Sequence, residues 1–475
     1  MLKFIKISDI IELYDFDINS ERIIVMRKFL ATLLAVSMIA SLCACNNNTE
    51  SGADSGESSV TEEEKKPLSN PVAVDENGNV DMKVALSYET DIDALIKDLE
   101  SREPDGSKPV SKNTNPETLA LFNYLKENYG KNIFAGQQYF QDGQYEQIVY
   151  YMETGDLPAI IGFDMIFSHG DQGINDQHIE DAIKWHTQQN GIVSFCWHWK
   201  VPVDIENDDV KGIAFYSDEI ANFSLKNAVT PGTKEYEVVI RDIDTIALKL
   251  QRLEAAGVPV LWRPLHEASG GWFWWGVKDT DTFKGQYYQK LWYMVFDRLE
   301  NYHKLTNLIW VWNGQAKKAE VNANTYDIGG MDIYPDTVDH SEQSIKYSTL
   351  ASIMPESKMA TISECGYIPD PDKVFAADSK VNWLYFMPWN GEFICKATAT
   401  GAIVTSLGGT PSINTDRMSS EFLKGVYSHD KVITLSELPD FEGTEKIIPE
   451  YLYLWELQNL DKSPENSKLK DYKKE

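Results

Sequence analysis

Two glutamates stand at the ends of strongly apolar runs, where a carboxylate is unusual. Glu267 ends the run 258–267, and Glu364 lies near the end of the run 359–366. Burying a carboxylate at such a place costs several kcal/mol unless it is paired or retained for function. Hydrolysis of a glycosidic bond needs one carboxyl group that protonates the leaving oxygen and a second that supplies electron density at the anomeric carbon. Glu267 and Glu364 are therefore our candidate catalytic pair.

A structural role is the alternative for each glutamate. Either carboxylate could be bonded to a neighbouring cation such as Arg263, or to backbone amides, without taking part in any chemistry. The two carboxyl groups of a catalytic pair must lie on either side of the same glycosidic bond. A separation of ~5 to 5.5 Å would imply a covalent glycosyl intermediate and retention of configuration. We therefore expect the fold to bring the two glutamates together.

Eight short apolar or β-branched runs alternate with amphipathic segments along the chain. Strands are expected at 132–137, 158–164, 191–199, 258–267, 308–314, 330–334, 359–366 and 383–389. Helices are expected at 145–154, 179–189, 236–256, 281–303 and 345–354. Within 236–256 the apolar residues recur at spacings of three and four, as on one face of a helix. Alternation of this kind predicts parallel strands joined by helical crossovers.

Eight strands favour a (β/α)8 TIM barrel, an α/β fold, over a doubly wound open sheet. No GxGxxG motif follows the first run, as it would in a dinucleotide-binding sheet. The carboxyl ends of barrel strands converge on one face, where catalysis takes place. Ionisable and aromatic residues end five of the runs, at 196–199, 263–267, 332–334, 363–366 and 388–390.

Charge and composition narrow the range of partners. The 475 residues carry a formal net charge of −29, which repels nucleic acid and other polyanions but leaves a neutral polymer unaffected. The chain also has 13 Trp and 23 Tyr, more than a core alone requires, and such rings stack on the apolar faces of sugars. We expect a neutral polysaccharide as substrate, no nucleic acid as partner, and a monomer.

The cysteines and histidines do not form a recognisable metal site. Cys196, Cys365 and Cys395 are scattered without ligand spacing and are expected to be buried thiols. No nucleotide-binding loop, haem motif or HExxH sequence is present. We therefore expect no cofactor and no metal ligand.

The first 45 residues predict an export signal. From Met26 the chain has a basic start, an apolar run at 29–42 and a small-residue cleavage site, so we expect a signal peptide at 26–44 after an upstream segment. The sequence Leu-Cys-Ala-Cys at 42–45 resembles a bacterial lipobox, which predicts that Cys45 is lipidated. The apolar run is shorter than the ~20 residues of a membrane-spanning helix. We expect a cell-surface lipoprotein held by its lipid alone; a secreted protein without lipid is the alternative.

The remaining chain divides by composition. Residues 46–75 are mostly polar and are expected to form a flexible linker. Residues 76–460 are expected to form one catalytic domain, and the charged tail 461–475 is expected to fray.

The sequence resembles glycoside hydrolase family 26, the β-mannanase family. This family belongs to a clan of retaining TIM-barrel glycosidases. The segment 260–276, Val-Leu-Trp-Arg-Pro-Leu-His-Glu-Ala-Ser-Gly-Gly-Trp-Phe-Trp-Trp-Gly, resembles the acid/base segment of that family, including His266 before Glu267. The resemblance extends through 195–198, 332–335, 362–366 and 387–389, and covers roughly residues 115–438.

The resemblance implies roles for particular residues. Glu267 would be the acid/base and Glu364 the nucleophile, with Arg263 and His266 orienting the pair. Gly270 and Gly271 would let the loop after Glu267 fold back over the cleft. Four further side chains would line the subsite of the scissile sugar: His198, Trp272, Tyr334 and Trp389. Trp274 and Trp275 are expected to pack in the core, and the inserts 202–232 and 391–414 to form the rim of the cleft.

The function implied is a retaining endo-β-1,4-mannanase acting on mannan, galactomannan or glucomannan. Two alternatives remain from the sequence. One is a mixed-linkage β-glucanase or xylanase of the same barrel family. The other is a lipoprotein that binds carbohydrate without cutting it, which would have two doubly wound lobes and no need of paired carboxylates.

Overall fold

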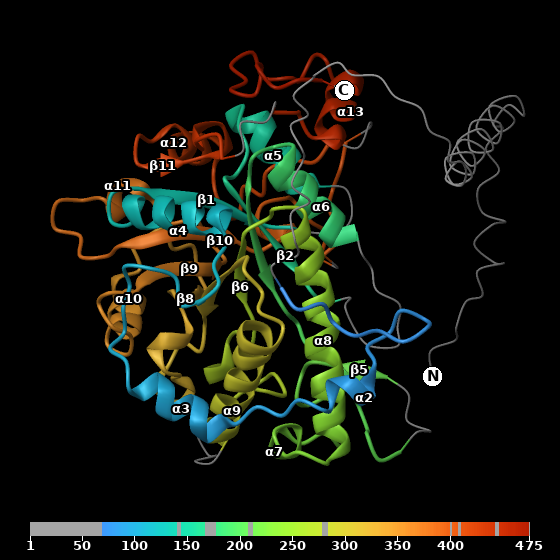
Figure 1. Cartoon of the computed structure of the whole chain (residues 1–475). Coiled ribbons are helices and arrows are strands. Elements are labelled where there is room, and N and C mark those ends of the chain that lie inside the picture. Colours follow the sequence, from blue (N-terminus) through green and yellow to red (C-terminus); the bar gives the residue numbers. More distant parts are fainter. Residues whose placement is uncertain are drawn as a thin grey trace, which may run out of the picture. The chain divides into compact units, whose positions relative to one another are not determined.

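A closed barrel of eight parallel strands forms the centre of the described chain (Figure 1). The computed structural model describes residues 69–139, 144–166, 177–207, 212–277, 284–399, 401–406, 410–441 and 446–474. The strands pair in sequence order, and the last pairs with the first. They are β1 (Ile133–Gln138), β2 (Ile160–Asp164), β3 (Ile192–Cys196), β6 (Val260–Arg263), β7 (Leu308–Trp312), β8 (Ile328–Ile333), β9 (Met359–Cys365) and β10 (Trp383–Pro388).

Each of the eight expected runs overlaps one of these strands, so the (β/α)8 barrel is confirmed. The strands are buried along almost their whole length, because side chains fill the barrel on one face and helices cover the other. A short strand, β11 (Val432–Ile433), adds to the outer edge of β1.

Helices surround the barrel, and the expected ones are present. They are α4 (Pro116–Asn128), α5 (Tyr145–Thr154), α6 (Gln177–Thr187), α8 (Lys234–Ala255), α9 (Lys284–Asp297), α10 (Ser344–Ala351), α11 (Pro371–Val374) and α12 (Ser420–Ser428). Four of them, α4, α8, α11 and α12, have side-chain caps at their first turn. In α4, for example, Asn115 accepts from Thr118 N–H, and in α8 Thr233 accepts from Tyr236 N–H. Helix α9 is shorter than expected, since a π-helical turn (Arg298–Tyr302) ends it.

The loop after β6 folds back tightly, as its glycines predict. Glu267 has a φ of 51° and Gly271 a φ of 73°, both in the left-handed region. A Cβ atom on Gly270 would come within about 2.1 Å of the Trp272 ring, so only glycine allows this close approach. The loop thereby places Trp272 beside Glu267.

The insert 202–232 packs against this loop. It holds β4 (Val201–Pro202) at its start, β5 (Ile213–Ala214) and α7 (Leu225–Ala228). Ser217 N–H donates to the carbonyl oxygen of Trp272 at 2.7 Å, so the insert lies at the cleft as expected. Phe393, in the second expected rim insert, lies 5.6 Å from the ring of Tyr334 between centroids.

The chain before the barrel is folded from Ser69 onward. Val72 is buried, and its N–H donates to Oε1 of Gln251 at 3.2 Å, although the composition predicted a flexible linker up to residue 75. Helices α2 (Met82–Ala85) and α3 (Ile92–Glu100) pack against α8 and α9. Tyr88 hydroxyl donates to Oδ2 of Asp297 at 2.7 Å. The described residues from Ser69 to Lys474 belong to one compact unit.

The expectation that residues 461–475 fray is wrong for the described part of that tail. Leu469 and Tyr472 are buried, and Lys468 N–H donates to the carbonyl oxygen of Gly155 at 2.8 Å. Two apolar anchors are enough to dock a segment that is charged in composition. The preceding helix, α13 (Glu450–Gln458), contacts α5.

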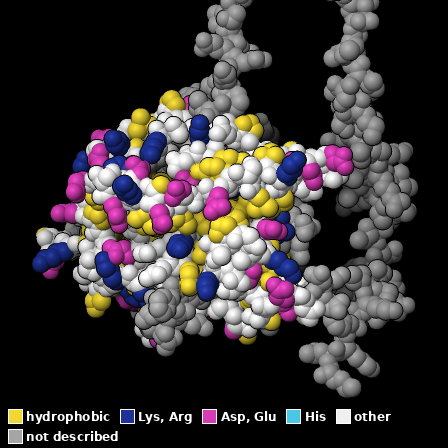
Figure 2. Space-filling model, turned by 60° about the horizontal axis from the view of Figure 1, so that its bottom comes forward, with side chains coloured by type: hydrophobic (Ala, Val, Ile, Leu, Met, Phe, Trp, Pro, Cys, Tyr) yellow, Lys and Arg dark blue, Asp and Glu magenta, His cyan; other side chains and the backbone are white. Residues whose placement is uncertain are grey.

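The outer surface mixes charges of both signs. In Figure 2, Lys and Arg lie interspersed with Asp and Glu over the face in view, with apolar side chains between them. Among the described residues, none of the helices combines the length and apolar character needed to cross a bilayer. The predicted signal peptide, Cys45 and most of the predicted linker lie outside the described residues.

Candidate active site

Glu364 lies near the carboxyl end of β9 with donors on both of its oxygens. Arg263 Nη2 donates to Oε1, and the hydroxyl of Tyr334 donates to Oε2 at 2.6 Å. The Glu364 side chain is buried, so these two bonds replace the solvation that it loses. The carboxylate is therefore held in one orientation at the mouth of the barrel.

Arg263, the last residue of β6, bridges two acids. Its Nη1 donates to Oδ2 of Asp332 at 3.2 Å while Nη2 binds Glu364. Burial by itself would lower the pKa of this guanidinium, but the carboxylates of Glu364 and Asp332 raise it well above the usual value. Arg263 is thus a permanent cation between two carboxyl groups.

A bulge brings Asp332 opposite Glu364. Met331 pairs with Ile362, but the next pair is Asp332 with Glu364, so Ser363 is an extra residue in β9. Such an insertion redirects side chains and is frequent beside active sites. It places Asp332 and Glu364 at one level of the barrel.

Ser363 and Asn313 hold Asp332 in place. Ser363 Oγ donates to Oδ1 of Asp332 at 2.6 Å, and Asn313 Nδ2 donates to the same oxygen at 3.1 Å. A Cβ atom on Gly330 would come within 2.5 Å of Ser363 Oγ, so the network needs glycine there. Burial and the nearby Glu364 raise the pKa of Asp332, although Arg263 and these two bonds act in the opposite direction.

Glu267 stands across the mouth on the loop after β6. Its N–H donates to the backbone carbonyl of Asn313 at 2.8 Å, which fixes the main chain. Trp272 Nε1 donates to its Oε2 at 3.0 Å. Burial, then the charges of Asp332 and Glu364, raise the pKa of Glu267 above its ordinary value. The environment therefore favours the protonated form of this carboxyl group.

The three acids meet in space. One carboxylate oxygen from each of Glu267, Asp332 and Glu364 lies within 4.8 Å of the other two. The structure therefore brings together the two glutamates that the sequence singled out.

His198 and His266 form a second wall of the site. His198 Nδ1 bonds to Oδ2 of Asp164 at 2.6 Å, and its ring centroid lies 4.6 Å from that of His266. Burial opposes a charge on His198, but Asp164 outweighs it and raises the pKa of His198. Burial, the charge of His198 and that of Arg263 lower the pKa of His266. His198 therefore favours the charged form and His266 the neutral form.

His266 was expected to orient the two glutamates, but it contacts other residues. Among the described residues its ring makes no hydrogen bond to Glu267 or Glu364, and its Nδ1 is buried without a partner. Its carbonyl oxygen accepts from Trp275 Nε1 at 2.9 Å. Arg263, in contrast, contacts Glu364 directly.

Aromatic rings frame the carboxyl groups. Trp272 is 46% exposed and Tyr334 41% exposed, while Trp389 is half-buried with its ring centroid 5.8 Å from that of His198. Exposed rings beside buried acids suit the apolar faces of a sugar. Trp274 and Trp275 are buried, as expected for core residues.

Sequence reasoning gave no role to several residues of the site. Asp164, Asn313 and Asp332 all stand at strand ends, which was the available signal, but each is a single polar residue without a partner nearby in sequence. Tyr216 is exposed and stacks on Phe273, with 5.5 Å between the ring centroids. Burial and then the charge of the nearby Glu267 raise the pKa of Tyr216. The insert that carries Tyr216 has no pattern that predicts this position.

Two groups of donors in the described chain lie close enough to hold a metal ion. One is Asp164, Cys196 and His198, and the other is the three acids of the mouth. In the first group His198 Nδ1 already bonds to Asp164, and burial raises the pKa of the Cys196 thiol, which disfavours a thiolate. In the second group Asp332 and Glu364 are already paired with the guanidinium of Arg263.

Known proteins resemble this chain over most of the barrel. A mannan endo-1,4-β-mannosidase of Thermothelomyces thermophilus is 36% identical over 331 residues, which are 68% of this chain and 62% of the relative. Mannan endo-1,4-β-mannosidase B of a Piromyces species is 35% identical over 356 residues, 71% of this chain and 56% of the relative. The match thus spans between half and two thirds of the length of these curated relatives.

Solved structures share the fold. A β-(1,4)-mannanase of Podospora anserina is 32% identical with a TM-score of 0.58, covering 72% of this chain and 71% of that chain. A β-mannanase from a symbiotic protist of the termite Reticulitermes speratus, complexed with gluco-manno-oligosaccharide, is 31% identical with a TM-score of 0.59, covering 71% of this chain and 100% of that chain. The model of glycosyl hydrolase family 26 matches residues 110–402, well over half of the 475 residues. The chain therefore belongs to glycosyl hydrolase family 26.

Proposed function

We propose that this protein is a retaining endo-β-1,4-mannanase that hydrolyses mannan, galactomannan or glucomannan. The observation that carries the proposal is the approach of Glu267 and Glu364, since one carboxylate oxygen of each lies within 4.8 Å of the other. Retaining pairs stand ~5 to 5.5 Å apart, whereas inverting pairs need ~6.5 to 9.5 Å to admit a water molecule. The mannan-cleaving relatives support the choice of substrate.

Glu364 is the nucleophile in this proposal. Arg263 and Tyr334 each donate a hydrogen bond to its carboxylate and hold the nucleophile in one orientation. One oxygen of Glu364 attacks the anomeric carbon as the bond to the leaving oxygen breaks. The product of this step is a glycosyl ester on Glu364.

Glu267 is the acid and then the base. Its raised pKa keeps the proton that it must give to the leaving oxygen. After that transfer the Glu267 carboxylate takes a proton from water, the water oxygen attacks the anomeric carbon, and the ester bond to Glu364 breaks. Both glutamates return to their first state, and the sugar keeps its original configuration.

The remaining site residues bind the sugar that is cut. Trp389 offers a half-buried ring face for stacking, and Trp272 places an exposed ring next to the acid/base. His198 and His266 lie side by side and offer ring nitrogens to hydroxyl groups of that sugar. Asp332 acts through its neighbours, because it holds Arg263 against Glu364.

We also propose that the protein is anchored at the cell surface. Cys45 is the lipidated first residue of the mature chain, the linker separates the barrel from the membrane, and the barrel works as a monomer. Replacing Cys45 with Ser should move the protein from the membrane fraction to the medium. Recovery of the Cys45→Ser protein with the membranes would contradict the lipid anchor.

Product release from polysaccharides tests the function. The wild-type protein should release reducing ends from galactomannan, and Glu364→Ala should lower the rate by at least ~10³-fold, as loss of a nucleophile does in other hydrolases, with unchanged circular dichroism. Preferential release from mixed-linkage glucan or xylan would favour those alternatives. Binding of mannan without release of reducing ends would favour a carbohydrate-binding lipoprotein.

A further inference from the structure

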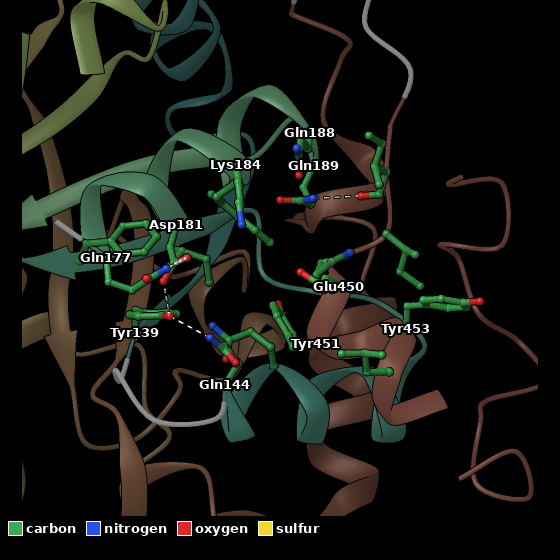
Figure 3. Close-up of a pocket in the computed structure, with 18 residues that line it drawn as sticks. Tyr139, Gln144, Gln177, Asp181, Lys184, Gln188, Gln189, Glu450, Tyr451 and Tyr453 are labelled. Carbon is green, nitrogen blue, oxygen red and sulfur yellow. Dashed lines mark hydrogen bonds between the residues drawn. The ribbon is translucent and has the colours of Figure 1, made fainter. Parts of the chain in front are cut away.

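A cavity of about 680 Å³ lies outside the barrel wall, between α5, α6 and the C-terminal segment 447–454 (Figure 3). Ile161 and Phe163 of β2 line it. The next residue, Asp164, turns the other way and bonds to His198 at the catalytic mouth. Since successive side chains of a strand point to opposite faces, the wall of β2 separates this cavity from the candidate active site.

The lining suits an uncharged ligand with hydroxyl groups. Aromatic side chains come from four parts of the chain: Tyr139 after β1, Phe163 on β2, Trp185 on α6, and Tyr451 and Tyr453 on α13. Five glutamines also line the cavity: Gln144, Gln147, Gln177, Gln188 and Gln189. Amides and phenols both donate and accept hydrogen bonds, and aromatic faces stack on sugar rings. The volume is within the ~300 to 1,000 Å³ of small-molecule sites.

The charges in the lining nearly cancel. The lining has one cation, Lys184, and two acids, Asp181 on the same helix and Glu450 on α13 (Figure 3). Both oxygens of Asp181 are engaged, since Tyr139 hydroxyl donates to Oδ2 at 2.6 Å and Gln177 Nε2 donates to Oδ1 at 2.7 Å. A strongly charged ligand would gain little from this lining.

Hydrogen bonds fix the walls before a ligand arrives. Gln144 Nε2 donates to the Tyr139 hydroxyl at 2.8 Å, and Gln189 Nε2 donates to the carbonyl oxygen of Ile447 at 3.1 Å. Ile447 N–H donates in turn to the carbonyl oxygen of Gln188 at 2.8 Å. The C-terminal segment is therefore attached to α6, and binding costs little ordering of these walls.

One buried polar atom in the lining lacks a partner. Gln147, on α5, is 2% exposed, and its Oε1 accepts no hydrogen bond from any described residue. Buried carbonyl oxygens are nearly always bonded, and an orphan costs the free energy of desolvation. This oxygen has almost no surface open to the cavity, so a ligand hydroxyl would bond to it once the Gln147 amide turns toward the cavity. Ordered water is the competing partner, and the experiment below separates the two.

We propose that this cavity is a second carbohydrate site, which binds a segment of neutral oligosaccharide without cutting it. The lining has no pair of free carboxyl groups, because Asp181 is already bonded on both oxygens. The site would hold polymer against the enzyme while the barrel cuts elsewhere. That the bound segment is a β-mannan rests on the proposed function.

Titration calorimetry with mannohexaose tests the proposal on the full chain. Glu364→Gln serves as the background, because it prevents turnover. This protein should bind two equivalents, one in the cleft and one in the cavity. Adding Tyr453→Ala should leave one equivalent. Adding Gln147→Leu should weaken the second equivalent about fivefold to tenfold without lowering the melting temperature, since leucine keeps the volume and removes only the orphan oxygen.

Leu457→Ala is the matched control. Leu457 lies on the same helix as Tyr453, is 53% exposed and does not line the cavity, so its loss should leave two equivalents. One equivalent in the Glu364→Gln background, or two equivalents of unchanged affinity in both cavity variants, would overturn the proposal. Unchanged affinity in Gln147→Leu would assign water to the orphan oxygen.

Two readouts separate this proposal from the proposed function. Cleavage of galactomannan by the wild-type protein reports on the barrel alone. If the wild type cuts no mannan but cellohexaose or xylohexaose binds and is lost with Tyr453→Ala, the cavity site stands and the mannanase proposal falls. If mannan is cut and the stoichiometry never changes, the cavity proposal falls alone.

Discussion

The hydroxyl of Tyr334 donates to Oε2 of Glu364 at 2.6 Å, while the residue remains 41% exposed. The opposite oxygen, Oε1, accepts from Arg263. Glu364 thus has one neutral and one charged donor. Because the ring of Tyr334 also faces the cleft, its hydroxyl can be tested separately from its contact surface.

Tyr334→Phe should lower kcat about tenfold to a hundredfold and change KM little. The substitution removes the hydrogen bond but keeps the ring, and a bond to a charged group contributes ~1.5 to 3 kcal/mol. Steady-state kinetics on mannohexaose would measure both constants. A large rise in KM with unchanged kcat would show that the hydroxyl binds sugar rather than orienting Glu364.

Trp272→Phe should move the basic limb of the pH profile to higher pH. Burial, Asp332 and Glu364 raise the pKa of Glu267, whereas the indole N–H of Trp272 lowers it. Activity requires the protonated acid, so it is lost as the pH rises through this pKa. Loss of the indole donor raises the pKa further and extends activity upward. A profile of kcat/KM against pH measures the limb; a shift to lower pH would contradict this role of Trp272.

Asp332→Asn should move the same limb in the opposite direction. After burial, the charge of Asp332 is the largest cause that raises the pKa of Glu267, so a neutral amide lowers that pKa. The amide oxygen can still accept from Arg263, but an NH2 group then replaces the oxygen that accepts from Ser363 and Asn313, so circular dichroism is measured alongside to check the fold. Opposite shifts in Trp272→Phe and Asp332→Asn, measured in one buffer series, would assign the limb to Glu267. A limb that moves in neither variant belongs to another group.

Asp164→Asn should lower the pKa of His198. Burial already opposes the charged imidazole, and Asp164 provides the compensating charge and a 2.6 Å bond. Without that charge the ring becomes neutral at a lower pH. NMR titration of the histidine ring protons measures this directly, with His198→Gln used for assignment. An unchanged His198 titration would mean that another group provides the compensating charge.

The barrel could be predicted from sequence because its signals are local. Each strand is a short apolar run, and the helix α8 repeats its apolar residues at helical spacing. Glu267 and Glu364 were found because a carboxylate is conspicuous at the end of such a run. The spacing of apolar residues can be read directly from the sequence, so the type and order of the helices and strands follow from it.

Arg263, Tyr334 and Trp272 were expected at the site and do bond to the two glutamates. The roles of Asp332 and Asn313 could not be predicted in the same way. Asp332 meets Glu364 only because Ser363 forms a bulge, and no residue pattern in β9 marks that shift of register. Asn313 reaches Asp332 from another strand, a contact that depends on barrel closure. The docking of Leu469 was missed because the composition of the tail hides two apolar anchors among charges.

The anomeric form of the first product shows directly whether Glu364 acts as the nucleophile of a double displacement. Proton NMR during the cleavage of mannohexaose would follow the anomeric signals before mutarotation. Since one carboxylate oxygen of Glu267 lies within 4.8 Å of one of Glu364, we expect double displacement, in which the new reducing end appears first as the β-anomer. First appearance of the α-anomer would mean single displacement by water, and would contradict the role of Glu364 as nucleophile.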